Sequence, residues 1–181
     1  MTRQTYTIEI ITPCFCGGAE PVQRGEIRSA SIRGQLRWWF RVLGGFRSLS
    51  SMPVHDQEAM IFGSTAGDDE GNAGKLTLRA RPLNIQTSRK DAAALGHRQF
   101  TDPAYLTFPM QSRLNQDGSR GVLESGSFEV SFIWRGAPSL VASLQSLVAV
   151  FANLGSMGSR VFDPEERSNR RSKRHCSALT D

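Results

Sequence analysis

The segment from Arg28 to Arg41 constrains the fold of this chain most, because its apolar residues recur at the spacing of an α-helix. Ser31 is expected to cap this helix, which should end at about Leu43, before Gly44-Gly45. The side expected to face a core carries Leu36, Trp39, Phe40 and Leu43. The segment therefore predicts an amphipathic helix packed against a core.

Arginines line the neighbouring side of the same predicted helix. Arg33, Arg37 and Arg41 follow one another at intervals of four residues and so form one stripe. No Asp or Glu occurs between Arg28 and Arg47, so no acidic residue of the helix pairs with the stripe. Guanidinium groups match phosphate oxygens, which favours a polyanion-binding surface; the plainer interpretation is a solvated helix face. In either case, alanine at these positions should change stability little.

Charge and length set broad limits on the class of protein. The chain has 181 residues, with 22 Lys and Arg against 17 Asp and Glu, which fits one basic domain of ordinary size. Only Lys75, Lys90 and Lys173 are lysines, and this bias towards arginine favours bidentate and stacking contacts. No apolar run approaches the ~20 residues of a membrane span, and the first residues lack a signal-peptide core. We therefore expect a cytoplasmic protein with no membrane contact.

Cysteine and histidine patterns favour neither a metal site nor an enzyme. Cys14 and Cys16 form a single C-x-C pair, whereas zinc sites need a second pair or spaced histidines, so both are expected to be small buried residues at a strand end. His55 and His97 are the candidates for a general acid or base, but neither lies in a recognisable site. Asp68-Asp69-Glu70 falls in a glycine-rich turn and is typical of a solvated charge run. We predict no catalytic residue, no metal and no cofactor.

Periodicity along the chain predicts the element order β-α-β-β-α. Alternating residues indicate strands at 6–12, 75–83 and 127–134, and helical spacing indicates helices at 31–43, about 56–61 and 138–153. Residues 84–122 have no clean periodicity and are interpreted as a long insertion, with Tyr105 to Phe108 as its one ordered element. With a final strand, this order is the α+β ferredoxin-like (RRM-like) arrangement, which by itself does not define a function.

Several motifs resemble the RAMP superfamily of CRISPR systems. They are Ile11-Thr-Pro-Cys-Phe-Cys-Gly-Gly18, Ile27-Arg-Ser-Ala-Ser-Ile-Arg-Gly-Gln-Leu-Arg-Trp-Trp-Phe-Arg41 and Ile61-Phe-Gly-Ser64, and the segment from Ser31 to Arg41 is the most specific part. Within that superfamily the chain is similar to the N-terminal domain of the first-subunit family of the Cmr complex, the type III-B RNA-guided effector. The resemblance covers roughly residues 5–160 and continues in Tyr105-Leu106, in the stretch from Glu124 to Phe132, and in the loop from Leu154 to Arg160.

The resemblance implies an RNA-binding module over residues 1–160 that is a structural subunit of a ribonucleoprotein in antiviral defence. Its implied partners are the backbones of guide RNA and target RNA, together with other Cmr-complex protein subunits. The RNA-binding positions carried over from the family are Arg28, Ser31, Arg33, Gly34, Arg37, Arg41, Gly155, Ser156, Gly158, Ser159 and Arg160. Related RAMP proteins cleave guide precursors with a histidine, so a metal-independent endoribonuclease using His55 or His97 is the alternative.

The chemistry of these positions agrees with that implication. Gly34 leaves room for a backbone to approach the helix start, where free N–H groups favour an anion. Left-handed glycines between Gly155 and Ser159 would expose consecutive backbone donors to a phosphate, whereas the plainer interpretation is a helix C-cap.

The sequence departs from the family after Arg160. Family members continue this loop with further glycines and a last strand, but no glycine follows Gly158, and residues 161–181 form a basic segment that is predicted to be disordered. One explanation is a functional basic tail that contacts RNA. The other, which we favour, is a truncated or frame-shifted product, because the motif breaks where the fold still needs its last strand. A non-functional family member is then a third interpretation.

Overall fold

The computed structural model describes residues 1–21, 23–64, 71–91, 119–155, 157 and 159–160. Along the chain, helices and strands follow the predicted order β-α-β-β-α, which confirms the α+β ferredoxin-like fold. The elements of this pattern are β1 (Thr2–Ile10), α1 (Ser29–Val42), β3 (Leu76–Pro82), β5 (Ser119–Trp134) and α5 (Val141–Leu154). Within the described residues, every helix is too short or too polar to span a bilayer.

Contacts divide the chain into two compact units. The first unit combines Met1–Tyr6, Ser29–Arg81 and Glu129–Gly155. The second unit combines Thr7–Arg28, Pro82–Phe128 and the residues from Ser156 onward. Each unit is described by itself below.

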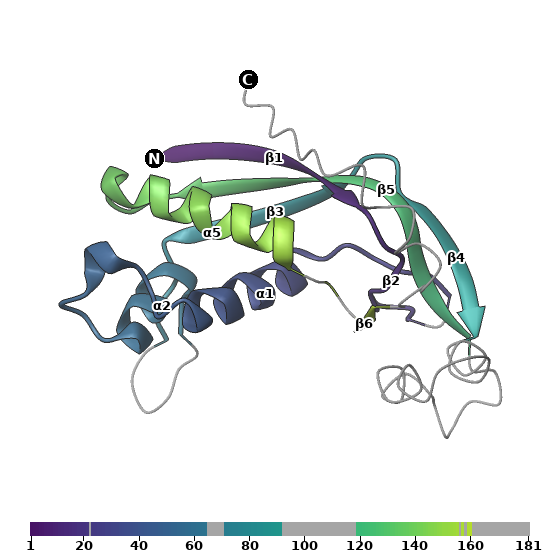
Figure 1. Ribbon diagram of the computed structural model, residues 1–181, viewed down its shortest axis with the longest axis horizontal. Helices are drawn as coiled ribbons and strands as arrows, with labels where there is room; N and C mark the ends of the chain where they lie inside the picture. Colours follow the sequence, from purple (N-terminus) through teal and green to yellow (C-terminus); the bar gives the residue numbers. More distant parts are fainter. Residues whose placement is uncertain (22, 65–70, 92–118, 156, 158, 161–181) are drawn as a thin grey trace. The chain divides into compact units, whose positions relative to one another are not determined.

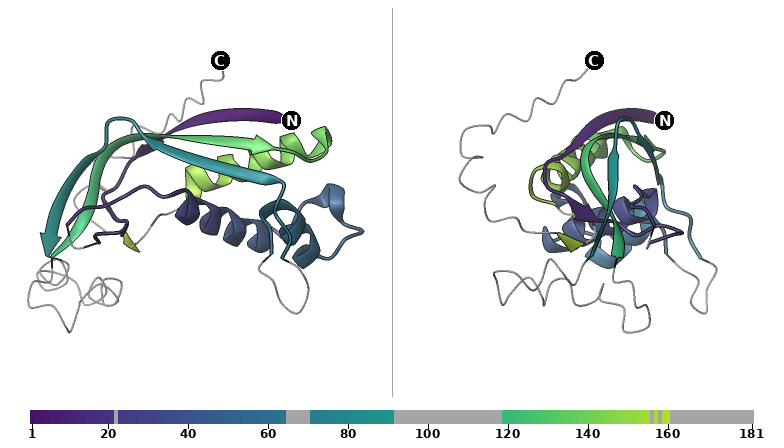
Figure 2. Two further views of the ribbon diagram at one scale, coloured as in Figure 1. Left: turned by 180° about the vertical axis from the view of Figure 1, so that it is seen from behind. Right: turned by 90° about the vertical axis from the view of Figure 1, so that its right-hand side faces the viewer.

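In the first unit, helices cover one face of a sheet. Strand β5 lies between β1 and β3, and α1 and α5 pack on the same side of these strands (Figures 1 and 2). Alternate residues of β5 point towards the helices, as period-two geometry requires, and Val130, Phe132 and Trp134 are buried. The helices contribute buried residues at helical spacing: Ile32, Leu36 and Phe40 from α1, and Leu144, Leu147, Val148 and Phe151 from α5.

α1 and α2 (Val54–Phe62) form a helical hairpin, and the connection between them contains a short 3-10 helix, η1 (Arg47–Leu49). α1 ends at Val42, just before the predicted Gly44 and Gly45, whose φ angles of 76° and 80° are left-handed conformations that glycine adopts without strain. The N–H of Gly45 donates to the carbonyl oxygen of Phe40 at 2.9 Å. This turn directs the chain back along α1.

In the second unit, the polar strand β4 pairs with β5 where the sequence indicated an irregular insertion. Strand β4 (Gln86–Asp91) runs antiparallel to the first half of β5, with Ser88 opposite Val122. The interpretation of 84–122 as one insertion is therefore corrected at both ends. β4 has only polar side chains and therefore shows no apolar alternation, and its pairing depends on the backbone of β5. The expected ordered element at Tyr105 to Phe108 lies outside the described residues.

Two short strands complete the second unit. β2 (Cys14–Phe15) pairs with β5, and it pairs antiparallel with β6 (Ser159–Arg160), so that Cys14 lies opposite Arg160. Cys14 and Cys16 are both buried at this strand end, as predicted, and their sulfur atoms lie 3.5 Å apart as free thiols. The predicted tail at 161–181 lies outside the described residues.

Other boundaries differ from the predictions by a few residues. β1 occupies Thr2–Ile10 and neighbours β5 in the sheet, whereas the predicted strand is 6–12, because the polar residues Arg3 and Gln4 give no apolar alternation. β5 begins at Ser119 and not at residue 127. Its earlier start follows from β4, which provides a partner that local pattern cannot show.

Candidate nucleic-acid interface

The arginine-bearing helix begins earlier than predicted. α1 starts at Ser29, whose hydroxyl oxygen accepts a hydrogen bond from the backbone N–H of Ala80 on β3 at 3.0 Å. This contact ties the first turn of α1 to the sheet. Ser31 therefore does not cap the helix. It lies inside the first turn with an exposed side chain.

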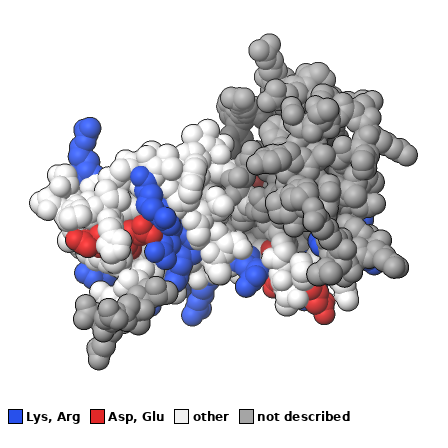
Figure 3. Space-filling view, turned by 90° about the horizontal axis from the view of Figure 1, so that it is seen from below, with Lys and Arg blue, Asp and Glu red and all other residues white. Residues whose placement is uncertain are grey.

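The arginine stripe has an acidic partner on a different helix. Arg37 donates from Nε to Oε1 of Glu58 at 2.6 Å, and Nε of Arg41 lies 3.2 Å from Oε2 of the same residue. The expectation of an unpaired stripe is wrong, because it considered acidic residues only within the helix. Glu58 reaches the stripe from α2, across the hairpin. Figure 3 shows basic side chains gathered beside a patch of acidic ones on this face.

The pairing leaves each guanidinium available to a ligand. Glu58 is only 7% exposed, whereas the side chains of Arg37 and Arg41 are 35% and 58% exposed. Both arginines approach the carboxylate with Nε, which is one of five N–H donors on the group. Among the described residues, no hydrogen bond occupies their terminal amino groups. Two guanidinium groups and one carboxylate leave a local net charge of one positive unit.

The remaining positions of α1 form an open surface. Arg33 is half-buried and has no ion-pair partner among the described residues. Arg28 precedes α1 and belongs to the second unit, where it is exposed. A Cβ at Gly34 would meet no atom within 4 Å, so this part of α1 is free for a close approach. One turn later, Trp38 is 51% exposed and contacts Trp39 edge to face, with ring centroids 4.9 Å apart. Trp38 follows Gly34 by four residues, so the two positions are neighbours on the helix surface.

The apolar stripe also needs correction. Leu36 and Phe40 are fully buried as predicted, but Leu43 is 53% exposed and Trp39 is only partly buried. The helix ends at Val42, so Leu43 leaves the helical stripe and enters the turn. Ile32 takes the remaining place in the core.

The glycine loop shows a different conformation from the one expected. Gly155 has φ −70° and ψ 167°, so it is extended and not left-handed. Its N–H donates to the carbonyl oxygen of Phe151 at 2.8 Å, and a Cβ would overlap that oxygen, so glycine serves here as a C-cap. Ser156 and Gly158 lie outside the described residues, and of Ser159 and Arg160 only the β6 backbone is described. The RNA contacts of this loop remain a prediction.

The histidines form no site among the described residues. His55 is exposed, with Nδ1 3.3 Å from Oδ1 of Asp56, and His97 lies outside the described residues. In the part of the chain that the structure describes, no three His, Cys, Asp or Glu residues lie close enough together to hold a metal ion.

The candidate interface thus lies on the arginine-bearing helix α1 of a ferredoxin-like domain. The chain belongs to the RAMP superfamily, whose model matches residues 7–163. It is 41% identical over 87 residues to the CRISPR system Cmr subunit Cmr1-2 of Pyrococcus furiosus, a match that covers 48% of this chain and 43% of that protein. It is 35% identical over 66 residues to subunit Cmr1-1 of the same organism, covering 36% of this chain and 20% of the relative.

A solved structure supports the fold. The crystal structure of Cmr1 from Pyrococcus furiosus in its apo form superposes with a TM-score of 0.58 at 22% identity. The match covers 89% of this chain and 46% of the solved chain. The chain therefore spans less than half the length of the proteins that it resembles.

Two residues of this surface were missed by sequence reasoning. Glu58 stands beside the apolar residues Ile61 and Phe62 on a short predicted helix, and a charged residue on a buried face needs a partner. The apolar surroundings of Glu58 in the sequence could therefore have indicated a buried ion pair. Trp38 gave no comparable signal, because two consecutive tryptophans on an amphipathic helix do not reveal which one faces solvent.

Proposed function

We propose that this chain is an RNA-binding structural subunit of a type III-B Cmr effector ribonucleoprotein in antiviral defence, and that the exposed face of α1 contacts the backbone of guide or target RNA. The observation that carries this proposal is the pair of guanidinium groups on Arg37 and Arg41, whose terminal amino groups point to no described partner. The names of the relatives, both Cmr subunits, support the assignment to this complex.

The neighbouring residues favour RNA over a generic polyanion. Phosphate groups are bound by arginine forks, and unpaired bases stack on exposed aromatic rings. α1 offers both, since the exposed Trp38 is three residues from Arg41 and therefore adjacent to it on the helix surface. Gly34 leaves the space beside the indole open. Single-stranded RNA is the ligand that uses all three features.

A binding titration tests the proposal. The purified chain should bind a labelled single-stranded RNA with an affinity that falls steeply as salt is raised. Alanine at Arg33, Arg37 or Arg41 should each reduce the salt slope, by about 1 for each phosphate contact that is lost. Arg79→Ala is the matched control: Arg79 is exposed on β3 and alternates with the buried Leu78, so it faces away from the helices.

The same experiment separates the alternatives. Soluble, folded protein that fails to bind RNA at low salt contradicts the proposal. RNA cleavage that is abolished by His55→Ala or His97→Ala would replace it with the metal-independent endoribonuclease. Salt-sensitive binding without cleavage supports a structural, non-catalytic subunit.

A further inference from the structure

The buried carboxylate of Glu58 pairs with two arginines of α1, and in both pairs the arginine atom that faces it is Nε. Glu58 accepts from Nε of Arg37 at 2.6 Å, and its other oxygen lies 3.2 Å from Nε of Arg41. We propose that Glu58 is a positioning residue, which turns Arg37 and Arg41 into a two-guanidinium clamp for a single phosphodiester group. This inference rests on the proposed function, because it names the chemistry that α1 recognises in RNA.

The geometry directs both guanidinium groups to one ligand. Residues four apart on a helix are neighbours, with Cβ atoms about 5–6 Å apart. Glu58 accepts a hydrogen bond from Nε of Arg37 and forms an ion pair with Nε of Arg41, so it holds the two groups beside one carboxylate. Among the described residues, no hydrogen bond occupies their terminal amino groups. A phosphodiester has two non-bridging oxygens, so each oxygen can accept from one guanidinium group.

The charge of the cluster matches the same ligand. Two arginines and one carboxylate sum to one positive charge, and a phosphodiester carries one negative charge. Without Glu58, two adjacent guanidinium groups would repel each other and lose side-chain order. The carboxylate thus lowers the total charge but holds the donors in place.

Glu58 is itself held by a rigid part of the hairpin. The preceding residue, Gln57, is 2% exposed and accepts a hydrogen bond from the N–H of Phe46 at 2.9 Å. Its amide nitrogen donates to the carbonyl oxygens of Leu49 at 3.0 Å and Met52 at 2.8 Å. These three bonds fasten α2 to the connection that follows α1. A shift of Glu58 would therefore break these hydrogen bonds, one of which is buried and two of which are part-buried.

Replacing Glu58 by Gln distinguishes positioning from plain electrostatics, because the two accounts predict opposite signs. The change conserves volume and makes the surface more positive by one charge. If the arginines act only as charges, Glu58→Gln binds single-stranded RNA more tightly. If Glu58 positions them, affinity falls by about tenfold, the order of loss seen when supporting partners of other binding groups are removed. The salt slope then falls by about 1.

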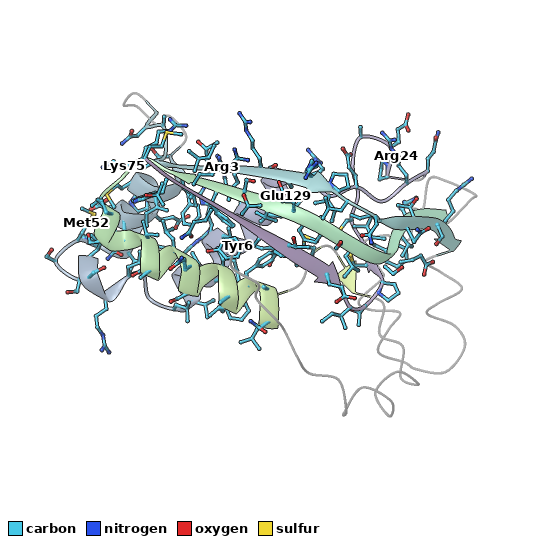
Figure 4. All side chains as sticks on the ribbon, turned by 90° about the horizontal axis from the view of Figure 1, so that it is seen from above. Arg3, Tyr6, Arg24, Met52, Lys75 and Glu129 are labelled. Atoms are coloured by element: carbon cyan, nitrogen blue, oxygen red, sulfur yellow. The ribbon has the colours of Figure 1, made fainter. Side chains whose placement is uncertain are left out.

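Glu129→Gln is the matched control for charge. Glu129 pairs with Arg81 at 3.0 Å and lies on β5, next to the buried Val130, so it faces away from the helices (Figure 4). The substitution makes the same charge change in another arginine pair of the same unit. RNA affinity should stay the same or rise slightly.

Two further variants keep the inference testable if Glu58→Gln fails to fold. Arg37→Lys and Arg41→Lys preserve every charge but replace the planar guanidinium by an ammonium group. The clamp predicts weaker binding for both, whereas a charge-only surface predicts no change. Thermal unfolding of each variant shows whether the folded state is present at the assay temperature.

The outcomes separate this inference from the proposed function. If the original chain does not bind RNA, the proposed function fails and the clamp fails with it. If the original chain binds RNA and Glu58→Gln binds equally well or better, only the clamp is wrong. Weaker binding by Glu58→Gln with unchanged binding by Glu129→Gln supports the clamp.

Discussion

Arg37 donates a 2.6 Å hydrogen bond from Nε to Oε1 of Glu58, which stands 21 residues later in the chain. The bond joins α1 to α2 across the turn at Gly44 and Gly45. It gives Arg37 a structural role beside the RNA contact proposed for it, because the carboxylate that it neutralises is nearly inaccessible to water. Arg33, four residues earlier, has no such partner among the described residues.

Arg37→Ala should therefore destabilise the fold, contrary to what an exposed arginine stripe would predict. Removing Arg37 leaves a buried carboxylate oxygen without its partner, which costs about 1–3 kcal/mol. The loss stays below that of a fully broken buried pair, since Arg41 still faces Glu58. Urea unfolding measures the difference. Arg33→Ala is the control and should stay within about 0.5 kcal/mol of the original chain; equal losses at both positions would contradict this account.

Periodicity predicted those parts of the fold that depend on local sequence. Leu36 and Phe40 lie one turn apart and are both buried, and the helix ends at the glycines that were expected to end it. The alternation from Phe128 to Trp134 likewise predicted a strand whose even-numbered residues face the core. In each case the residues that carry the signal also make the contact.

Features that depend on a distant partner were not predictable in this way. β4 consists of polar residues, and only its register with β5 makes it a strand. Glu58 meets Arg37 because a turn reverses the chain between them, so a search for acidic neighbours within α1 could not find it.

Phe40→Ala should be among the most damaging changes in the first unit. Phe40 is completely buried and meets Phe46 and Phe62 edge to face, with centroids 5.0 and 5.8 Å away. Deleting its ring removes these contacts and leaves a cavity, at a cost of about 3–5 kcal/mol. Trp39→Ala is the comparison, and should cost less because Trp39 is only partly buried. Chemical denaturation measures the free energy of unfolding of both variants. A larger loss for Trp39→Ala than for Phe40→Ala would mean that Trp39 is the core residue.

Trp38→Ala should separate RNA binding from stability. The side chain is half exposed, and its one ring contact, with Trp39, contributes about 0.5–1.5 kcal/mol. If a base stacks on the indole, affinity for single-stranded RNA falls by about 1–3 kcal/mol. Trp38→Phe keeps an aromatic face and should restore most of the binding. An alanine variant that binds RNA normally would exclude stacking at this position.

Gln57→Leu should loosen the hairpin that carries Glu58. The amide of Gln57 makes three hydrogen bonds to backbone groups, and leucine fills the same space without replacing any of them. Each buried group left unpaired costs about 1–3 kcal/mol, so thermal unfolding should occur at a clearly lower temperature. RNA affinity should fall as well, because Glu58 follows Gln57 on α2. Normal stability together with normal affinity would show that the hairpin does not depend on these bonds.

The thiols of Cys14 and Cys16 should be unreactive in the folded chain. The hydrogen bond with Cys14, together with burial, raises the pKa of the Cys16 thiol, so the reactive thiolate is not formed at neutral pH. With Cys176→Ser removing the third thiol, Ellman's reagent should modify the pair only at the rate of unfolding, and faster as urea is added. Since the pKa is higher in the folded state, this contribution to stability is complete below the pKa of the unfolded thiol and is lost as pH rises above about 8.5. Rapid modification of the native chain at pH 8, without urea, would mean that these sulfur atoms are accessible.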